Sequence, residues 1–338
     1  MVIGGYGQVG NYVSSKLNDV VVAGRNQEKA DLFIKENHIK GYSRCIDTRH
    51  LKREDFTNIN TVIMCVESNN LEVLQACIRY KINYIDISPS YEILAPMLEF
   101  KEQIQEEGIS CVIGVGIAPG VSNLLCKEAS KDMDEVKTID SYLMLGVGEQ
   151  HGKNAILWFL QHIYSNTEGI DSFHKTKRIM LHRKKGVRKQ TMTMIDLADC
   201  HIMQQEYKNA ICQSWFAYDI NWTTKMVCFL KKVGVFKSLV SNNQEKREKA
   251  YKRFQKLLHI ELSIAKLLHI GTDEYVSQVQ VTGVRDGKEV NNELWVNGEC
   301  NSKITAYAAV AVANKIENLP SGLHYIDQVI DLGEIHSI

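Results

Sequence analysis

Three glycines near the start of the chain have the spacing that binds the phosphates of a dinucleotide. Gly5, Gly7 and Gly10 follow a short apolar segment and precede an amphipathic one. In such a motif the first glycine allows a tight turn, the second lets the backbone approach the pyrophosphate, and the third lets a helix pack closely on a strand. Free N–H groups at the helix start then hold the phosphates. We therefore expect Gln8 and Val9, which lie between the last two glycines, to contact the cofactor as well. The alternative is a glycine turn that serves only to reverse the chain.

The end of the second apolar segment indicates which dinucleotide is bound. Gly24, Arg25 and Asn26 stand where an NAD enzyme places an acidic side chain for the ribose hydroxyls, about 20 residues beyond the loop. A guanidinium suits a 2′-phosphate, which a carboxylate would repel. We predict NADP(H), with these three residues as contacts; Arg25 could otherwise be a surface residue that caps the next helix. Asp47 is a candidate adenine contact or, equally, a cap of the turn that follows it.

Polar side chains that could take part in a reaction follow the later apolar segments. Ligands of a doubly wound sheet bind beyond the carboxyl ends of its strands, and Asp86, Ser88 and Tyr91 are expected at such an end. Hydride transfer needs the cofactor set against the substrate carbon, and a positioned proton donor assists it. Asp86 and Ser88 could equally cap the loop before Pro89. His151 is a candidate substrate ligand or proton donor, or else a solvated loop histidine.

Four further residues at these strand ends are candidate cofactor contacts: Cys65, Val66, Gly116 and Pro119. Cys65 ends an apolar segment and is more typical of a small core residue than of a nucleophile. A basic run at 182–189 contains no aromatic residue, so we interpret it as exposed charge at a hairpin tip and not as a nucleic-acid site.

The order of segments predicts an α/β fold. In the first 120 residues, short apolar runs alternate with amphipathic stretches, which is typical of a parallel Rossmann sheet. The predicted strands are 1–3, 20–23, 43–46, 61–66, 84–87 and 110–114, and the predicted helices are 11–17, 26–37, 71–80 and 93–107. Beyond residue 136 the strands gather together, which predicts an α+β domain with a mostly antiparallel sheet. Its predicted strands are 136–147, 178–182, 188–194, 274–284 and 289–296, its predicted helices are 197–206 and 243–270, and a last helix covers 305–317.

Length and composition bound the class of protein. A chain of 338 residues exceeds the usual size of one core, so we expect two domains: 1–122 with 303–338 for NADP binding, and 123–302 for substrate binding and dimerisation. Basic and acidic residues balance at 40 each, which gives no overall field to attract nucleic acid or a membrane. Nine cysteines without a Cys-x-x-Cys spacing indicate reduced thiols in the cytoplasm and no metal site. Glycines and Pro119 interrupt the apolar run at 109–126, so we do not expect it to span a membrane.

Four segments together resemble the saccharopine dehydrogenase-like (saccharopine reductase type) NADP-binding family: 3–10 (IGGYGQVG), 21–26 (VVAGRN), 83–88 (NYIDIS) and 116–123 (GIAPGVSN). The resemblance covers residues 1–130 and beyond them rests on 281–288 and 305–314. It implies a two-domain enzyme, a homodimer, that reduces an imine or oxidises an amine of a small amino-acid-derived substrate. Saccharopine reductases carry an acidic residue where this chain has Ala118, so saccharopine itself is not the expected substrate.

Two functions from different classes remain open on the sequence. The first is an NADP(H)-dependent oxidoreductase that acts on a C–N centre. The second is a non-catalytic NADP(H)-binding redox sensor or scaffold, which the lack of an unambiguous acid–base residue favours. A carbonyl reductase would need a tyrosine and a lysine at helical spacing, whereas Tyr80-Lys81 and Tyr207-Lys208 are adjacent pairs.

Overall fold

The chain forms two units, each with its own sheet. The computed structural model describes residues 1–68, 71–149, 170–235 and 271–338, with a few isolated positions between these ranges. Unit 1 consists of Met1–Lys127, Leu197–Ile202 and Ser302–Ile338, and unit 2 consists of Glu128–Asp196 and Met203–Asn301. The predicted fold class is confirmed, since unit 1 has a parallel doubly wound sheet and unit 2 has a mixed, mostly antiparallel sheet with helices.

The sheet of unit 1 has seven parallel strands in the order β15-β6-β5-β4-β1-β2-β3. Its strands are β1 (Val2–Ile3), β2 (Val20–Gly24), β3 (Gly41–Cys45), β4 (Thr61–Met64), β5 (Asn83–Asp86), β6 (Ser110–Ile113) and β15 (Gly322–Tyr325). From β1 the chain first builds outward through β2 and β3, then returns to the other side of β1 with β4. The topological switch point therefore lies between β1 and β4, and ligands of such sheets bind beyond the carboxyl ends of the strands there.

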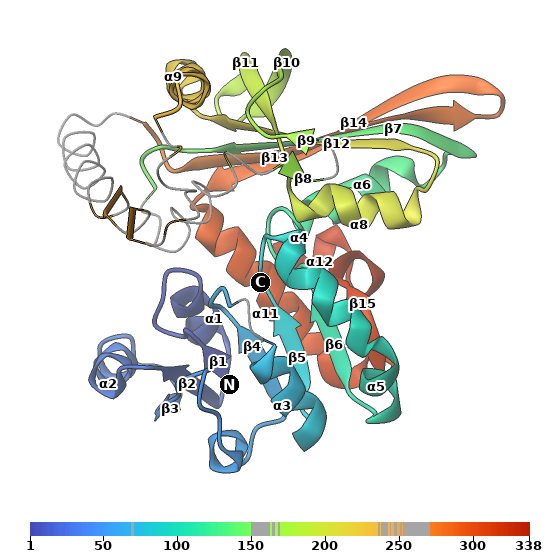
Figure 1. Cartoon of the computed structure of the whole chain (residues 1–338). Coiled ribbons are helices and arrows are strands. Elements are labelled where there is room, and N and C mark those ends of the chain that lie inside the picture. Colours follow the sequence, from blue (N-terminus) through green and yellow to red (C-terminus); the bar gives the residue numbers. More distant parts are fainter. Residues whose placement is uncertain are drawn as a thin grey trace. The chain divides into compact units, whose positions relative to one another are not determined.

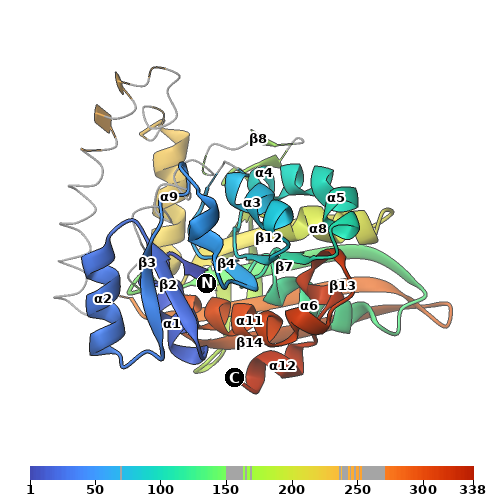
Figure 2. The ribbon, with the colours of Figure 1, turned by 90° about the horizontal axis from the view of Figure 1, so that it is seen from below.

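Helices cover both faces of this sheet. The helices of the unit 1 segments are α1 (Gly10–Lys16), α2 (Gln27–Glu36), α3 (Glu72–Tyr80), α4 (Tyr91–Leu94), α5 (Lys101–Glu106), α6 (Val121–Ser130), which continues into a unit 2 segment, α11 (Asn301–Lys315) and α12 (Leu332–His336). α1 and α11 lie on one face, and α3 and α5 lie on the other (Figures 1 and 2). Burial on both faces explains why strands such as β2 and β6 are buried at every position.

Two elements of unit 1 differ from the prediction. The helix predicted over 93–107 is divided into α4, a 3₁₀ segment at Ala95–Phe100 and α5. Pro96 lies in that segment, and a proline inside a helix removes a backbone donor and clashes with the preceding turn. The sequence also did not reveal β15, whose four residues pair in parallel with β6 at the edge of the sheet.

The sheet of unit 2 has six strands in the order β10-β11-β12-β7-β13-β14. They are β7 (Glu135–Leu145), β10 (Thr176–Arg183), β11 (Gly186–Ile195), β12 (Ile211–Tyr218), β13 (Glu274–Arg285) and β14 (Lys288–Glu299), and β8 (Asn166–Thr167) pairs with β9 (Ile170–Asp171) separately. All of the six-strand pairings are antiparallel except that of β12 with β7. The predicted hairpin at Asp286-Gly287 is confirmed, with φ values of 52° and 71° that suit its tight turn.

Between β11 and β13, the described residues form two helices, α8 (Ala198–Glu206) and α9 (Asn221–Lys232). α8 was predicted, whereas α9 and β12 were not. The helix predicted over 243–270 lies outside the described residues, apart from isolated positions. Within the described ranges, no helix is long and apolar enough to cross a membrane.

Candidate functional site

The loop between β1 and α1 forms a cradle that side chains would fill. The N–H groups of Gly4 and Gly5 both donate to the carbonyl oxygen of Ala23, at 2.8 and 3.2 Å. A Cβ on Gly10 would lie 2.1 Å from the carbonyl oxygen of Gly4, so only glycine fits there. A Cβ on Gly7 would approach only that same oxygen, at 3.0 Å, and Gly7 is exposed. Space is therefore left open in front of Gly7.

The same loop presents backbone donors that are not used by the fold. Within the part of the chain that the structure describes, the N–H groups of Gln8, Val9 and Gly10 have no backbone acceptor. Successive free N–H groups in a glycine-rich turn attract anions. An open cradle with unused donors at the switch point of a parallel sheet fits the pyrophosphate of a dinucleotide.

Tyr6 ties this loop to the end of β2. Its ring lies over Gly24, where a Cβ would come within 2.5 Å of Tyr6 Cε1, and the N–H of Asn26 donates to its hydroxyl at 3.1 Å. The side chain of Asn26 caps α2 by accepting the N–H of Lys29 at 2.8 Å. Arg25 therefore does not cap this helix. Its side chain is exposed and forms no ion pair among the described residues.

Asp47 has a local partner. Its carboxylate accepts two hydrogen bonds from the Arg49 guanidinium, at 3.0 and 2.7 Å, and a third from the Arg49 backbone N–H at 3.1 Å. These hydrogen bonds hold the pKa of Asp47 well below its usual range. The geometry is that of a turn cap, which the sequence left open beside an adenine contact.

Asp86, at the end of β5, is 1% exposed, and both of its oxygens are hydrogen-bonded. The Tyr84 hydroxyl donates to Oδ2 at 2.6 Å and the Ser88 N–H donates to Oδ1 at 2.7 Å. Burial raises the pKa of the Asp86 carboxyl, and the hydrogen bonds from Ser88 and Tyr84 oppose this. Asp86 thus closes the turn before Pro89, and Ser88 is buried with it.

Glu67 is a titratable group at this edge that the sequence did not single out. It follows β4, and its Oε1 is buried without a hydrogen-bond partner among the described residues. Burial raises the pKa of Glu67 to about 7, and the nearby Asp86 carboxyl adds to the rise. The available signal was a charged residue placed directly after the apolar run 61–66. By contrast, burial raises the pKa of the Cys65 thiol to about 12, which argues against a reactive thiolate there.

Tyr91 meets a histidine that was not predicted. The ring of His201, near the start of α8, stacks on Tyr91 with centroids 4.3 Å apart and planes 6° apart. Both residues belong to unit 1, and His201 is 9% exposed. No local pattern marks His201, because more than a hundred residues separate it from Tyr91. His151, the predicted histidine, lies outside the described residues.

The segment after β6 forms a tight buried loop. Gly116 and Gly120 are bridged, and a Cβ on Gly120 would lie 2.0 Å from the Gly116 carbonyl oxygen. Asn123 accepts the N–H of Gly120 at 2.9 Å, which closes the loop against the start of α6. Pro119 follows a cis peptide bond and is buried, as Gly116 is. These two predicted contacts therefore present little surface to a ligand in the structure as described.

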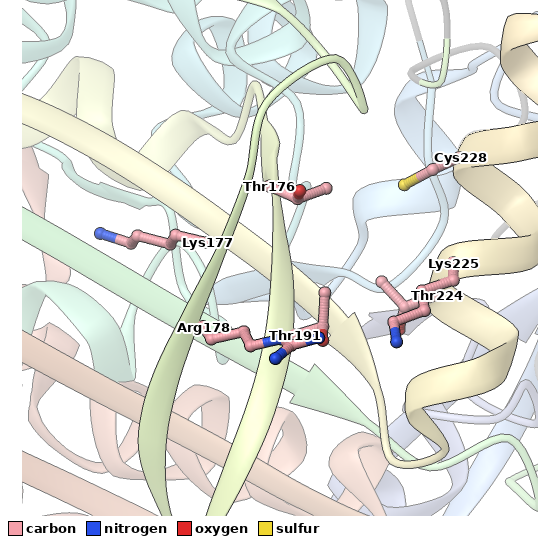
Figure 3. A pocket seen from close by; sticks show the side chains of 7 residues that line it. All are labelled: Thr176, Lys177, Arg178, Thr191, Thr224, Lys225 and Cys228. Atoms are coloured by element: carbon pink, nitrogen blue, oxygen red, sulfur yellow. The ribbon is translucent and has the colours of Figure 1, made fainter.

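Unit 2 contains a separate cavity of about 340 Å³ between β10, β11 and α9. Figure 3 shows Thr176, Arg178 and Thr191 facing the α9 residues Thr224, Lys225 and Cys228. Lys177 points the other way (Figure 3), to an ion pair with Asp140 at 2.8 Å. None of the predicted site residues that the structure describes lines this cavity. Across the described ranges, no group of three or more His, Cys, Asp and Glu residues is placed to hold a metal ion.

Comparisons with known proteins agree with the fold. No family model matches the chain. Carboxynorspermidine synthases of Vibrio alginolyticus and Vibrio cholerae are each 25% identical to it over 181 residues, 44% of this chain and 43% of theirs. The match thus spans less than half of these relatives.

Two solved structures resemble the chain over nearly its whole length. Saccharopine dehydrogenase (L-Glu forming) of Saccharomyces cerevisiae has a TM-score of 0.62 and 14% identity over 99% of this chain and 94% of that one. An amine dehydrogenase of Mycobacterium smegmatis has a TM-score of 0.51 and 10% identity over 98% and 96%. The resemblance to saccharopine dehydrogenase-like proteins is confirmed at the level of the fold.

The raised pKa of Glu67 predicts a pH-dependent stability. Between its ordinary value of 4.5 and about 7, the folded protein keeps a proton that the unfolded chain has lost. The free energy of unfolding therefore falls across this window as the pH rises, and the loss is complete above pH 7. Glu67→Gln cannot ionise and does not lose this stability. The difference in free energy of unfolding, variant minus unmodified protein, should therefore be about 1–3 kcal/mol larger at pH 8 than at pH 5.

Denaturant unfolding of both proteins at the two pH values checks this. Glu99→Gln is the control, because Glu99 is exposed. A Glu67→Gln effect that is the same at pH 5 and pH 8 would show that this carboxyl does not titrate abnormally.

Proposed function

We propose that this chain, which has the fold of saccharopine dehydrogenase, is an NADP(H)-dependent oxidoreductase. Its reaction takes place at the C–N centre, imine or amine, of a small amino-acid-derived molecule. The observation that carries the proposal is the glycine cradle, with the unused N–H groups of Gln8, Val9 and Gly10 at the switch point of a parallel sheet. The homodimeric state that the sequence resemblance implies and the cytoplasmic location that the cysteine pattern indicates are part of the same proposal.

The preference for NADP(H) rests on the end of β2. Arg25 is exposed there and no carboxylate pairs with it in the described ranges, while Asn26 provides the helix cap. A free guanidinium at this position is suited to the 2′-phosphate, with which it forms charge-assisted hydrogen bonds. Gly24 leaves room for Tyr6, which holds the phosphate loop against the same strand end.

We propose a C–N centre as the site of reaction because of the names of the similar proteins. Amine chemistry is common to the names saccharopine dehydrogenase, amine dehydrogenase and carboxynorspermidine synthase. Bound NADP(H) supplies or accepts the hydride in such chemistry. The residues of this chain bind its phosphates at the glycine loop and shape the carboxyl edge of the sheet with Asp86, Ser88 and Tyr91. We retain His151 as a proposed substrate ligand.

A redox sensor or scaffold that binds NADP(H) without turnover is the second candidate. One observation favours it: Asp86, the leading acid–base candidate in the sequence, is buried with both oxygens hydrogen-bonded. The two functions differ in turnover and not in cofactor binding.

A panel of amines and 2-oxo acids or aldehydes, offered in pairs with NADPH, tests the enzyme against the sensor. We expect NADPH oxidation with at least one pair, and the loss of NADPH absorbance measures it. Gly7→Val should abolish both binding and turnover at an unchanged melting temperature, because its side chain would occupy the space left for the pyrophosphate. Tight NADPH binding without oxidation by any pair would favour the sensor.

The contribution of Arg25 can be measured separately. We expect the unmodified protein to bind NADPH at least about tenfold more tightly than NADH, about 1.4 kcal/mol, which a partly exposed charged contact can supply. Arg25→Ala should remove most of this preference while leaving NADH affinity unchanged. Arg79→Ala is a matched control, since Arg79 is exposed in the last turn of α3, at the opposite edge of the sheet. Equal affinities for the two cofactors in the unmodified protein would contradict the assignment.

A further inference from the structure

Glu67 lies beside the glycine cradle. β4 pairs with β1, and the N–H of Cys65 donates to the carbonyl oxygen of Ile3 at 2.9 Å. A Cβ on Gly4 would lie 3.1 Å from Val66 Cγ2 and 3.2 Å from the Cys65 carbonyl oxygen. The end of β4 therefore packs directly on the loop, and Glu67 is the next residue along the chain. This places it at the switch point, where a sheet of this kind binds its ligand.

The carboxyl groups of Asp86 and Glu67 differ in whether their oxygens already have hydrogen-bond partners. Both oxygens of Asp86 accept hydrogen bonds from the protein itself. Glu67 Oε1 is buried and has no partner among the described residues. A buried polar atom without a partner destabilises the fold, so such an atom in a native protein calls for an explanation. A polar hydrogen on a bound ligand would supply the missing partner.

The charges around Glu67 favour a carboxyl that exchanges a proton near neutral pH. Asp86 is the charged group that acts on it among the described residues, and the Tyr84 hydroxyl and the Ser88 N–H bind Asp86. The Cys65 thiol, two residues before Glu67, has its pKa raised to about 12 and is neutral. Burial and Asp86 together bring the pKa of Glu67 to about 7, where an acid–base group works best at physiological pH.

We propose that Glu67 is the residue that donates a proton to the substrate nitrogen during reduction and accepts one from it during oxidation. The inference rests on the proposed function and deepens it. In reduction, the imine carbon gains a hydride from NADPH and the nitrogen gains the Glu67 proton, so that the C=N π bond becomes one C–H and one N–H bond. NADPH becomes NADP⁺, and the Glu67 carboxylate takes a proton back from water. Asp86 acts on Glu67 only through its charge and does not itself exchange protons.

The first test needs no substrate. The nicotinamide ring is positive in NADP⁺ and neutral in NADPH, so an ionised Glu67 beside it would favour NADP⁺ alone. We expect the ratio of the NADPH to the NADP⁺ dissociation constant to rise by about threefold or more from pH 6 to pH 8. The 2′-phosphate is present in both forms, so its own titration cancels in this ratio. Glu67→Gln should give a flat ratio, and Glu99→Gln should behave as the unmodified protein.

The second test uses the amine and carbonyl pair that the protein turns over. Glu67→Gln should lower kcat by about 10²- to 10⁴-fold, the usual contribution of general acid–base catalysis, and should keep the NADPH dissociation constant within about threefold. The pH dependence of kcat near 7 should disappear with it. Glu67→Asp, which keeps an ionisable group, should retain part of the activity and a shifted pH profile.

The outcomes separate the two proposals. Normal NADPH binding with a ratio that does not change with pH in the unmodified protein would overturn the role of Glu67 alone. Unchanged kcat in a folded Glu67→Gln variant would do the same. Loss of NADPH binding in the unmodified protein would contradict the proposed function, and the role of Glu67 would fall with it. If no pair is turned over, the affinity ratio decides whether Glu67 faces the ring.

Discussion

The carbonyl oxygen of Gly4 lies so close to the start of α1 that Gly10 has no room for a side chain. A Cβ there would stand 2.1 Å from that oxygen. Because α1 begins in contact with Gly4, the residues between Gly4 and Gly10 form a loop that projects from the sheet. The backbone of this loop lies at the carboxyl edge of the unit 1 sheet. The open space before Gly7 and the unused N–H groups that follow it are consequences of this one close approach. Tyr6, wedged over Gly24, fixes the loop to the second strand in the same way.

Of the two acidic residues at the neighbouring strand ends, Asp86 stabilises the fold and Glu67 is the one we propose to exchange a proton. Asp86 is enclosed by Tyr84 and Ser88 and serves the turn that follows β5. Burial raises the pKa of Glu67, and the nearby Asp86 carboxyl adds to the rise, so that a second carboxyl is prepared for proton exchange. A structural acid that tunes a functional one is a recurrent use of like charges at active sites. The two roles could not be separated from residue types, because both residues are acids near the ends of apolar runs.

Much of unit 1 could be predicted because its signals are local. The glycine spacing, the apolar strands and the residues at their ends all appear within short stretches of the chain. What the sequence did not reveal depends on contacts between distant segments. His201 becomes part of the site region only by stacking on Tyr91, and β15 becomes a strand only by pairing with β6. Glu67 was visible as a residue, but the orphaned oxygen and the raised pKa that single it out are properties of its burial.

Hydrogen–deuterium exchange of the backbone amides, with and without NADPH, tests the central claim most directly. The free N–H groups of Gln8, Val9 and Gly10 should exchange fast in the protein alone and become strongly protected when the phosphates bind them. Peptides from the interior strands β7 and β13 of unit 2 provide the internal comparison, because each of these strands is paired on both sides. Protection centred on residues 4–11 is the predicted result. Saturating NADPH binding that leaves exchange at these residues unchanged would contradict the account, because the cofactor would then lie elsewhere.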